Sequence, residues 1–407
     1  MTEKSNVMER RDFLKRGLMG LTGLSAASLS GGSARNSGRP LPAGNADIIR
    51  RRLGKTGVSL PVVSMGVMNA DNENLVRAAL DSGIVLLDTA HFYQRGRNEE
   101  MIGRVIKDRP RDSYFIATKV PWMSRENGTE RYLPETGGGK FEDLADLSLK
   151  RLGLDHVDGF YCHDVDSEAG ALFEPLLETL SKMKKSGKTR FIGISTHSRE
   201  PEVIRGAVKA GVYDVILTAY NFRRKDLDAI NRAIAAAAGA GIGVIAMKTQ
   251  AGRFWDKLKK DPINMRAALK WALNNPNITT AIPGFTTFEQ LETDLPVMRD
   301  LTLTAREKSD LRLGGTQTGG FYCQQCGGCL AQCPQKLPIP DLMRSYMYAH
   351  AYRNYGQAHD LLSSLELPGN PCGECGSCAV ACASGFDIKN RIRDIAPLRD
   401  IPRDFFV

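Results

Sequence analysis

The chain has 407 residues, of which 42% are hydrophobic and 25% are charged, a composition typical of one large globular domain with a smaller one. Its formal net charge of +9 is concentrated in residues 1–52, which hold ten Lys/Arg and four Asp/Glu. The rest of the chain is close to neutral and has no basic stripe, so a nucleic-acid-binding function is excluded from the expected classes.

The first pattern along the chain lies at the N-terminus, where RRDFLK (10–15) precedes a short apolar run rich in Gly and Ser (17–32). It resembles a twin-arginine signal, with Glu9 in place of the usual small hydroxyl residue. The resemblance implies a signal peptide over residues 1–34, a linker over 35–51, and export of the folded protein by the twin-arginine machinery to the periplasm. The alternative is a disordered basic N-terminus. Because the apolar run is short, we expect no stable membrane span.

From residue 58 onward, short apolar runs alternate with longer amphipathic ones, as expected for strands covered on both faces and for helices between them. The strand-like runs are residues 61–67, 84–90, 114–120, 157–163, 190–196, 214–220, 243–249 and 279–285. Eight such units predict a parallel (β/α)₈ barrel, a TIM barrel, over residues 52–301, with its active site at the C-terminal strand ends. The alternative is a doubly wound sheet, but the turn after the first strand lacks a Gly-rich phosphate loop.

Four polar residues stand at or just after successive strand ends: Asp88, Tyr93, Lys119 and His163. A tyrosine normally titrates near pH 10 and is poorly matched to proton transfer at neutral pH. An ammonium beside it, held by a carboxylate, would stabilise phenolate and lower the pKa of the tyrosine. The four residues therefore suggest general acid–base chemistry on a carbonyl group.

With these residues, the stretch from about Arg52 to Leu301 resembles an aldo-keto reductase. The resemblance implies that Tyr93 donates or removes the proton and that Lys119 tunes its pKa. It further implies that Asp88 holds Lys119, that His163 orients the substrate oxygen, and that a nicotinamide exchanges hydride with the carbonyl carbon.

The cofactor positions implied by the resemblance match the family less well. Ser195 is present, but Thr196 replaces Asn, Leu217 replaces Gln, and Met247 stands where a tyrosine usually stacks on the nicotinamide. The basic pair that usually holds the 2′-phosphate of NADPH is replaced by Gly284 and Gln290. Lys248 and Arg253 are the candidate compensating cations. We therefore expect NAD or NADP, with NAD slightly favoured and tightly bound, and an unseen flavin as an alternative.

Eight of the nine cysteines lie in two C-terminal runs with the same spacing, C-x₂-C-x₂-C-x₃-C. They are Cys323, Cys326, Cys329 and Cys333 in the first run, and Cys372, Cys375, Cys378 and Cys382 in the second. This is the ligand spacing of bacterial ferredoxins with [4Fe–4S] clusters. Zinc sites prefer CxxC pairs separated by a longer loop, and disulfides are the other alternative in an oxidising compartment.

The last part of the chain, residues 319–407, resembles a mainly helical two-cluster ferredoxin module, preceded by a linker over 302–318. In such modules the fourth cysteine of each run serves the other cluster. The resemblance implies two interleaved sets of ligands. One is Cys323, Cys326, Cys329 and Cys382; the other is Cys333, Cys372, Cys375 and Cys378.

Together these patterns predict an oxidoreductase that acts on an aldehyde, ketone or alcohol, with sugars among the candidate substrates. Two clusters would link it to an external redox partner. One alternative is an electron-transfer protein whose barrel is a degenerate binding module. Another is an ordinary reductase in which the clusters only stabilise the fold.

Overall fold

The computed structural model describes residues 47–123, 137–252, 262–313, 323, 325, 327–350, 352–382 and 385–406. The predicted signal peptide lies outside these residues, as does most of the predicted linker over 35–51. Among the helices that the structure describes, none is long and apolar enough to cross a membrane.

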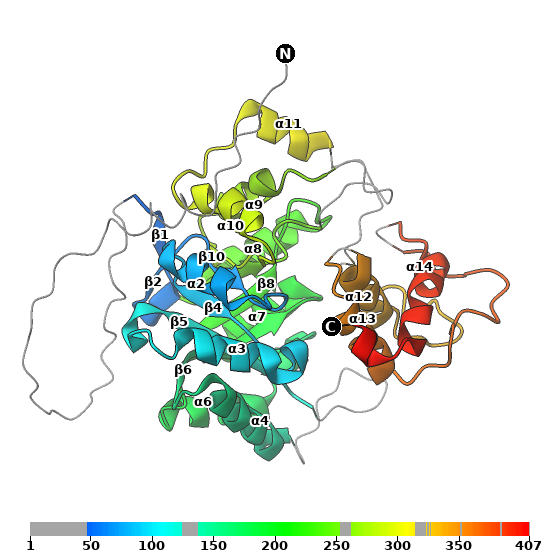
Figure 1. The fold of residues 1–407 in the computed structure, drawn as a ribbon, viewed down its shortest axis with the longest axis horizontal. Coiled ribbons are helices and arrows are strands. Elements are labelled where there is room, and N and C mark those ends of the chain that lie inside the picture. Colours follow the sequence, from blue (N-terminus) through cyan, green and yellow to red (C-terminus); the bar gives the residue numbers. More distant parts are fainter. Residues whose placement is uncertain are drawn as a thin grey trace, which may run out of the picture.

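The barrel consists of eight parallel strands in sequence order from β3 to β10, which confirms the predicted (β/α)₈ class (Figure 1). The strands are β3 (Met65–Gly66), β4 (Leu86–Asp88), β5 (Phe115–Pro121), β6 (Val157–His163), β7 (Thr189–Thr196), β8 (Val215–Ala219), β9 (Gly243–Met247) and β10 (Thr280–Ala281). The parallel bridges Val63–Ala281 and Gly66–Gly284 join the last strand to the first. The sheet is therefore closed and has no free edge.

Helices follow the strands along the outside of the barrel, as the amphipathic pattern predicted. They are α2 (Glu73–Asp81), α3 (Arg97–Ile106), α4 (Gly137–Leu152), α5 (Glu168–Ala171), α6 (Glu174–Lys185), α7 (Glu200–Ala210), α8 (Leu227–Gly239), α9 (Met265–Leu273) and α10 (Phe288–Asp294). Their apolar faces pack on the outer side of the sheet in one continuous core, which includes the fully buried Cys162.

A second core fills the inside of the barrel. The antiparallel hairpin of β1 (Arg50–Arg52) and β2 (Ser59–Pro61), which the sequence patterns did not predict, places Leu53 and Leu60 in this core. Tyr161 lies across the interior, and a Cβ on Gly159 would come within 2.6 Å of its hydroxyl. The bulk of the interior is thus packed, which leaves the C-terminal strand ends for chemistry.

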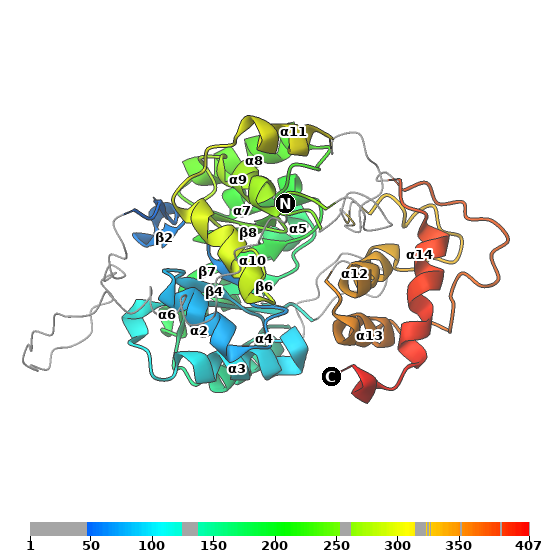
Figure 2. The ribbon, with the colours of Figure 1, turned by 45° about the horizontal axis from the view of Figure 1, so that its top comes forward.

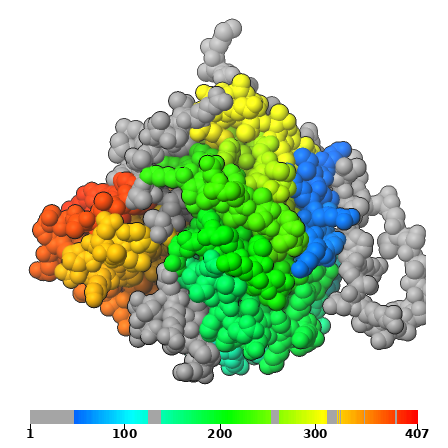
Figure 3. Space-filling view, turned by 180° about the vertical axis from the view of Figure 1, so that it is seen from behind, coloured from blue at the N-terminus to red at the C-terminus, as the bar shows by residue number. Residues whose placement is uncertain are grey.

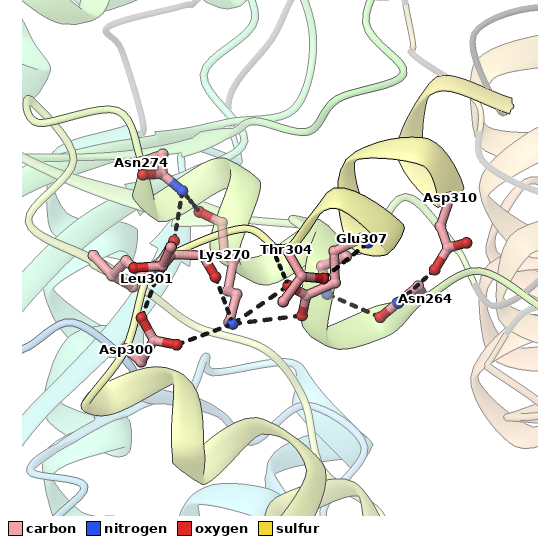
Figure 4. Close-up of polar contacts among 10 residues, drawn as sticks. Asn264, Lys270, Asn274, Asp300, Leu301, Thr304, Glu307 and Asp310 are labelled. Atoms are coloured by element: carbon pink, nitrogen blue, oxygen red, sulfur yellow. Dashed lines mark hydrogen bonds and ion pairs between the residues drawn. The ribbon is translucent and has the colours of Figure 1, made fainter.

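We predicted a linker over residues 302–318, but its described part contains helix α11 (Ala305–Leu313). Thr304 and Glu307 form a capping box: Glu307 Oε2 accepts from Thr304 N at 2.8 Å, and Thr304 Oγ1 accepts from Glu307 N at 3.1 Å. Lys270 of α9 donates to the carbonyl of Thr302 at 2.8 Å. Its Nζ also lies 3.4 Å from carboxylate oxygens of Asp300 and Glu307 (Figure 4). This first part of the stretch is therefore bound to the barrel.

The C-terminal module is helical and has its own core, which contains Cys372 and is contacted by four more cysteines. Its helices are α12 (Ile339–His350), α13 (Tyr355–Ser364) and α14 (Ile388–Ile395). Figures 1 and 2 show α12 and α13 on the side of the barrel and α14 farther away, and Figure 3 shows the module as a lobe on one side. The predicted helical ferredoxin-like domain is confirmed in class.

Candidate active site and cysteine sets

The centre of the candidate site is a buried ion pair between neighbouring strands. Lys119 Nζ of β5 lies 2.6 Å from Asp88 Oδ1 at the end of β4, and it also donates to the Thr89 carbonyl at 2.6 Å. Burial raises the pKa of Asp88 and lowers the pKa of Lys119, while their mutual attraction opposes both shifts. The pair is therefore held in one orientation inside the barrel mouth.

Tyr93 begins a tight turn just beyond β4, with its ring centroid 5.0 Å from Lys119 Nζ. The two residues after it, Gln94 and Arg95, have φ angles of 51° and 58°, in the left-handed region. Gln94 Nε2 compensates by donating to the carbonyls of Met68 at 3.1 Å and Ala70 at 3.0 Å. These bonds tie the turn to the loop after β3 and fix the position of the phenol.

His163 ends β6 with its ring centroid 5.9 Å from that of Tyr93. Burial, together with the positive charge of Lys119, lowers the pKa of His163 to about 3. The imidazole is therefore neutral at pH 7 and suited to hydrogen bonding with a substrate oxygen rather than to proton donation. The structure thus brings Asp88, Tyr93, Lys119 and His163 together at the strand ends.

The pKa of Tyr93 differs from the expectation drawn from the sequence. We expected Lys119 to lower it, but burial raises the pKa of Tyr93 above its ordinary value, and the carboxylates of Asp88 and Asp164 raise it further. Arg344 opposes this shift. The physical reason is that Lys119 is already neutralised by Asp88, so it stabilises phenolate too weakly to offset desolvation. In this state Tyr93 is a protonated phenol, the form of a proton donor.

The predicted nicotinamide contacts lie at the ends of β7 and β9. Ser195 Oγ accepts from Asp164 N at 3.0 Å, and Thr196 Oγ1 donates to the Ser198 carbonyl at 2.9 Å. Met247 faces the barrel interior, and Lys248 follows it with a φ of 56°. Burial lowers the pKa of Lys248 to about 8. These residues offer one hydroxyl that faces inward, one cation and an apolar wall.

The predicted 2′-phosphate positions carry no cation in the structure. Gly284 is exposed beside Gly66 of β3, and Gln290 Oε1 accepts from Thr286 N at 2.8 Å at the start of α10. Arg253 lies outside the described residues. Within the described residues, these two predicted positions therefore offer no charge to a phosphate.

The cysteines form two groups that interleave the two runs. Burial raises the pKa of Cys323 to about 12, and negative charge on the nearby Cys329 and Cys382 also raises it. Burial raises the pKa of Cys372 to about 11, and its neighbours are Cys375, Cys378 and Cys333. Gln332 links the two runs because it donates to the Gly328 carbonyl at 2.7 Å and accepts from Ala381 N at 2.8 Å.

This grouping agrees with the ligand sets that the ferredoxin resemblance implies, apart from Cys326, which lies outside the described residues. The eight described cysteines, which include Cys162 of the barrel, are all free thiols. Among the described residues, no three His, Cys, Asp or Glu side chains are spaced to hold a single metal ion. In a [4Fe–4S] cluster each thiolate binds a different iron, so binding there would require loss of the thiol protons.

Several residues around the site were not identified from the sequence. His197, just after Ser195, has its ring 5.9 Å from that of His163. Asp164, Arg344, Tyr348 and Tyr352 also lie near Tyr93. The charges of Asp164 and Arg344 act on the pKa of Tyr93. The charge of Tyr93 in turn raises the pKa values of Tyr348 and Tyr352. The available signal was the i, i+4 spacing of Arg344 and Tyr348, which places them on one face of α12, whereas Tyr352 lies beyond the end of that helix.

Comparisons with known proteins agree with this division of the chain. The model of the aldo/keto reductase family matches residues 61–268, and that of a 4Fe-4S dicluster domain matches residues 322–386. L-galactose dehydrogenase of Arabidopsis thaliana is 27% identical over 302 residues, which cover 64% of this chain and 91% of that protein.

Two solved structures share the barrel fold. Aldo-keto reductase AKR11C1 from Bacillus halodurans (holo form) aligns with a TM-score of 0.53 and 21% identity, over 68% of this chain and 99% of the other. An aldo-keto reductase from Klebsiella pneumoniae in complex with NADPH aligns with a TM-score of 0.52 and 20% identity, over 66% of this chain and 96% of the other.

Proposed function

Because the chain belongs to the aldo/keto reductase family and carries a 4Fe-4S dicluster domain, we propose that it is an oxidoreductase linking carbonyl–alcohol chemistry to one-electron transfer. The substrate class that we favour is a sugar or another small hydroxy compound, since a relative matched over most of the barrel is an L-galactose dehydrogenase. Its partner would be an external one-electron carrier protein.

The observation that carries the barrel part of the proposal is the convergence of four side chains. A carbonyl oxygen between Tyr93 and His163 would receive a hydrogen bond from each, because their rings lie 5.9 Å apart at 79°. Tyr93 supplies or removes the proton at that oxygen, and the Lys119–Asp88 pair fixes the electrostatic environment behind it. His163 remains neutral and orients the oxygen.

The residues present also fit a nicotinamide, which supplies hydride transfer when bound. Ser195 would hold its amide, Met247 would form the apolar wall against its ring, and Lys248 would lie near its phosphates. The uncharged Gly284 and Gln290 support NAD over NADP, although the Klebsiella pneumoniae structure contains NADPH. Strict NADP use would need a cation against the 2′-phosphate.

Two [4Fe–4S] clusters, when bound, supply one-electron transfer through the cysteine sets. Oxidation of one alcohol to a carbonyl releases two electrons and two protons: the nicotinamide would take a hydride and Tyr93 the other proton. A flavin would be needed to pass the two electrons of the hydride singly to the two clusters. We also propose periplasmic export by the twin-arginine route. Its basis is the RRDFLK segment and the need to assemble clusters before export.

The test is replacement of Tyr93 by Phe in holoenzyme purified without oxygen. We expect oxidation of a panel of aldoses, starting with L-galactose and with NAD or NADP supplied, to fall by at least about 100-fold while cluster absorbance is unchanged. Tyr114→Phe is the matched control, because Tyr114 lies immediately before β5, at the other end of the barrel. Activity that survives Tyr93→Phe would refute the assigned role.

A second candidate is an electron-transfer protein whose barrel no longer performs hydride chemistry. The observation in its favour is the apolar character of Leu217 and Met247, both in the packed barrel interior, where the family resemblance implies Gln and Tyr as cofactor contacts. Mass spectrometry of small molecules released on denaturation separates the two. A stoichiometric nicotinamide nucleotide supports the oxidoreductase, a flavin would replace the nicotinamide in it, and failure to bind any added nucleotide supports this second candidate.

A further inference from the structure

One side chain of the C-terminal module joins the two halves of the molecule. Arg344 of α12 has 19% of its side chain exposed, and its Nη1 lies 3.2 Å from Asp164 Oδ2 of the barrel. Its Nη2 donates to Gln325 Oε1 at 2.6 Å, beside the first cysteine run. The planar guanidinium can serve both partners at once because its donors point in fixed, separate directions.

On the barrel side, this contact reaches the candidate active site. Asp164 follows His163 directly, with a φ of 61°, and its N–H donates to Ser195 Oγ at 3.0 Å. The Asp164 carboxylate is one of the charges that raise the pKa of Tyr93, and Arg344 opposes it. The position of Arg344 therefore affects both the orientation of the loop after β6 and the charge around the phenol.

On the module side, the contact reaches a cysteine. Gln325 is 5% exposed, and its backbone N–H points at Cys323 Sγ at 3.3 Å. Lys248 of the barrel is also close enough to Cys323 for their charges to interact. By contrast, Cys378 of the other set is exposed. The set with Cys323 thus adjoins the barrel mouth, and the set with Cys378 reaches the solvent.

Two further contacts hold the module in this place. Asn354 Nδ2 donates to Asn69 Oδ1 of the barrel at 2.7 Å. The Asp360 carboxylate forms an ion pair with Arg95 of the Tyr93 turn, and it also accepts from Arg403 Nε of the module at 2.7 Å. Tyr348, one turn after Arg344, has its pKa raised chiefly by burial, and the charge of Tyr93 contributes. The face of α12 that carries Arg344 therefore lies over the candidate site.

We propose that Arg344 is a positioning residue that couples the Tyr93 site to the cysteine set of Cys323, Cys329 and Cys382, and that this set holds the cluster proximal to the barrel. The inference rests on the proposed function and deepens it. It makes the set of Cys333, Cys372, Cys375 and Cys378 the distal one, where the external carrier protein meets the enzyme.

The experiment is a redox titration of the holoenzyme, followed by electron paramagnetic resonance, in the absence of substrate. Cys378→Ser, at the exposed end of the distal set, assigns the two cluster signals. Arg344→Gln removes a positive charge near the proximal cluster, which disfavours its reduced form. We expect about a tenfold shift towards the oxidised form of that cluster alone, about 59 mV for one electron.

Three further variants sharpen the result. Arg393→Gln removes the same charge from an exposed position on α14 and should shift neither signal by more than about twofold. Asp164→Asn, which leaves the module untouched, should shift the proximal signal in the opposite direction. Arg344→Lys keeps the positive charge but loses the two-sided hydrogen bonding of the guanidinium. The potential of the proximal cluster should therefore be close to that of the wild type, while the pH profile of carbonyl turnover should differ from the wild type.

The outcomes separate the two levels of inference. The role of Arg344 would be overturned by equal shifts in the reduction potentials of both clusters, or by no shift in either Arg344→Gln or Asp164→Asn. Neither result would contradict the proposed chemistry at Tyr93. A wild-type protein without [4Fe–4S] signals would overturn the proposed function and this inference with it. If Arg344→Gln does not fold, the Asp164→Asn titration decides alone.

Discussion

The buried ion pair between Lys119 and Asp88 gives the sharpest test of the site's energetics. Their side chains are 2% and 3% exposed, and Lys119 Nζ lies 2.6 Å from Asp88 Oδ1. Asp88 Oδ2 has no hydrogen-bond partner among the described residues. Replacing Lys119 with Met, which has a similar length, would leave a carboxylate buried and uncompensated.

The expected loss of stability in Lys119→Met depends on how the unpaired Asp88 carboxylate responds to burial. Removing one partner of a buried pair typically destabilises a protein by about 3–5 kcal/mol. Burial already raises the pKa of Asp88, and loss of Lys119 removes the opposing attraction. The carboxyl group can then avoid the penalty only by binding a proton. The loss in stability should therefore be smallest near pH 5 and should increase as the pH rises to 8.

Urea denaturation followed by tryptophan fluorescence measures this loss, since all three tryptophans lie within the barrel sequence. A fall of about 1–2 M in the midpoint is expected at pH 8 for Lys119→Met. The double variant Asp88→Asn/Lys119→Met removes both charges and should recover about half of the loss. A single variant that loses less than about 1 kcal/mol, or a double variant no more stable than the single, would refute this account.

Two other buried carboxyl groups lead to further predictions. Burial raises the pKa of Asp294 to about 7, so the folded protein binds an extra proton between pH 4 and 7, and stability falls as pH rises through that range. Asp294→Asn keeps an acceptor for Gln250 Nε2, which lies at 2.8 Å. Its gain in thermal stability should grow from pH 4 to pH 8, to at most about 4 kcal/mol, and a gain independent of pH would contradict the assignment. Arg224 pairs with Glu200 at 2.7 Å and 3.0 Å, so Arg224→Met should destabilise by about 3–5 kcal/mol in the same urea assay. Adding Glu200→Gln should restore part of the lost stability. If it restores none, the unpaired charge of Glu200 is not the cause of the loss.

Much of the barrel could be predicted because its signals are local. The run 114–120 was expected to be a strand, and β5 spans Phe115–Pro121; 157–163 coincides with β6. An apolar run with both faces covered, followed by an amphipathic segment, specifies a β/α unit without knowledge of its neighbours. The placement of Asp88, Lys119 and His163 followed from the same logic, since parallel strands bring their ends to one edge.

Other local signals were present but were not used. The sequence from Thr304 to Glu307 has the capping-box pattern that begins α11, although we assigned a linker to it. The hairpin of β1 and β2 was also missed, because strands of three residues carry little periodicity. These differences concern elements that are short or that lack a strong apolar pattern.

The sequence by itself determined the eight β/α units, the polar residues at their ends and two cysteine runs of equal spacing, because each depends on residues close together in the chain. Tertiary structure alone decided how these parts interact. The direction of the pKa shift of Tyr93 depends on burial and on carboxylates that only the fold brings near it. Contact between Arg344 and Asp164 joins residues 180 positions apart, and such a contact depends on how two separately packed cores are docked.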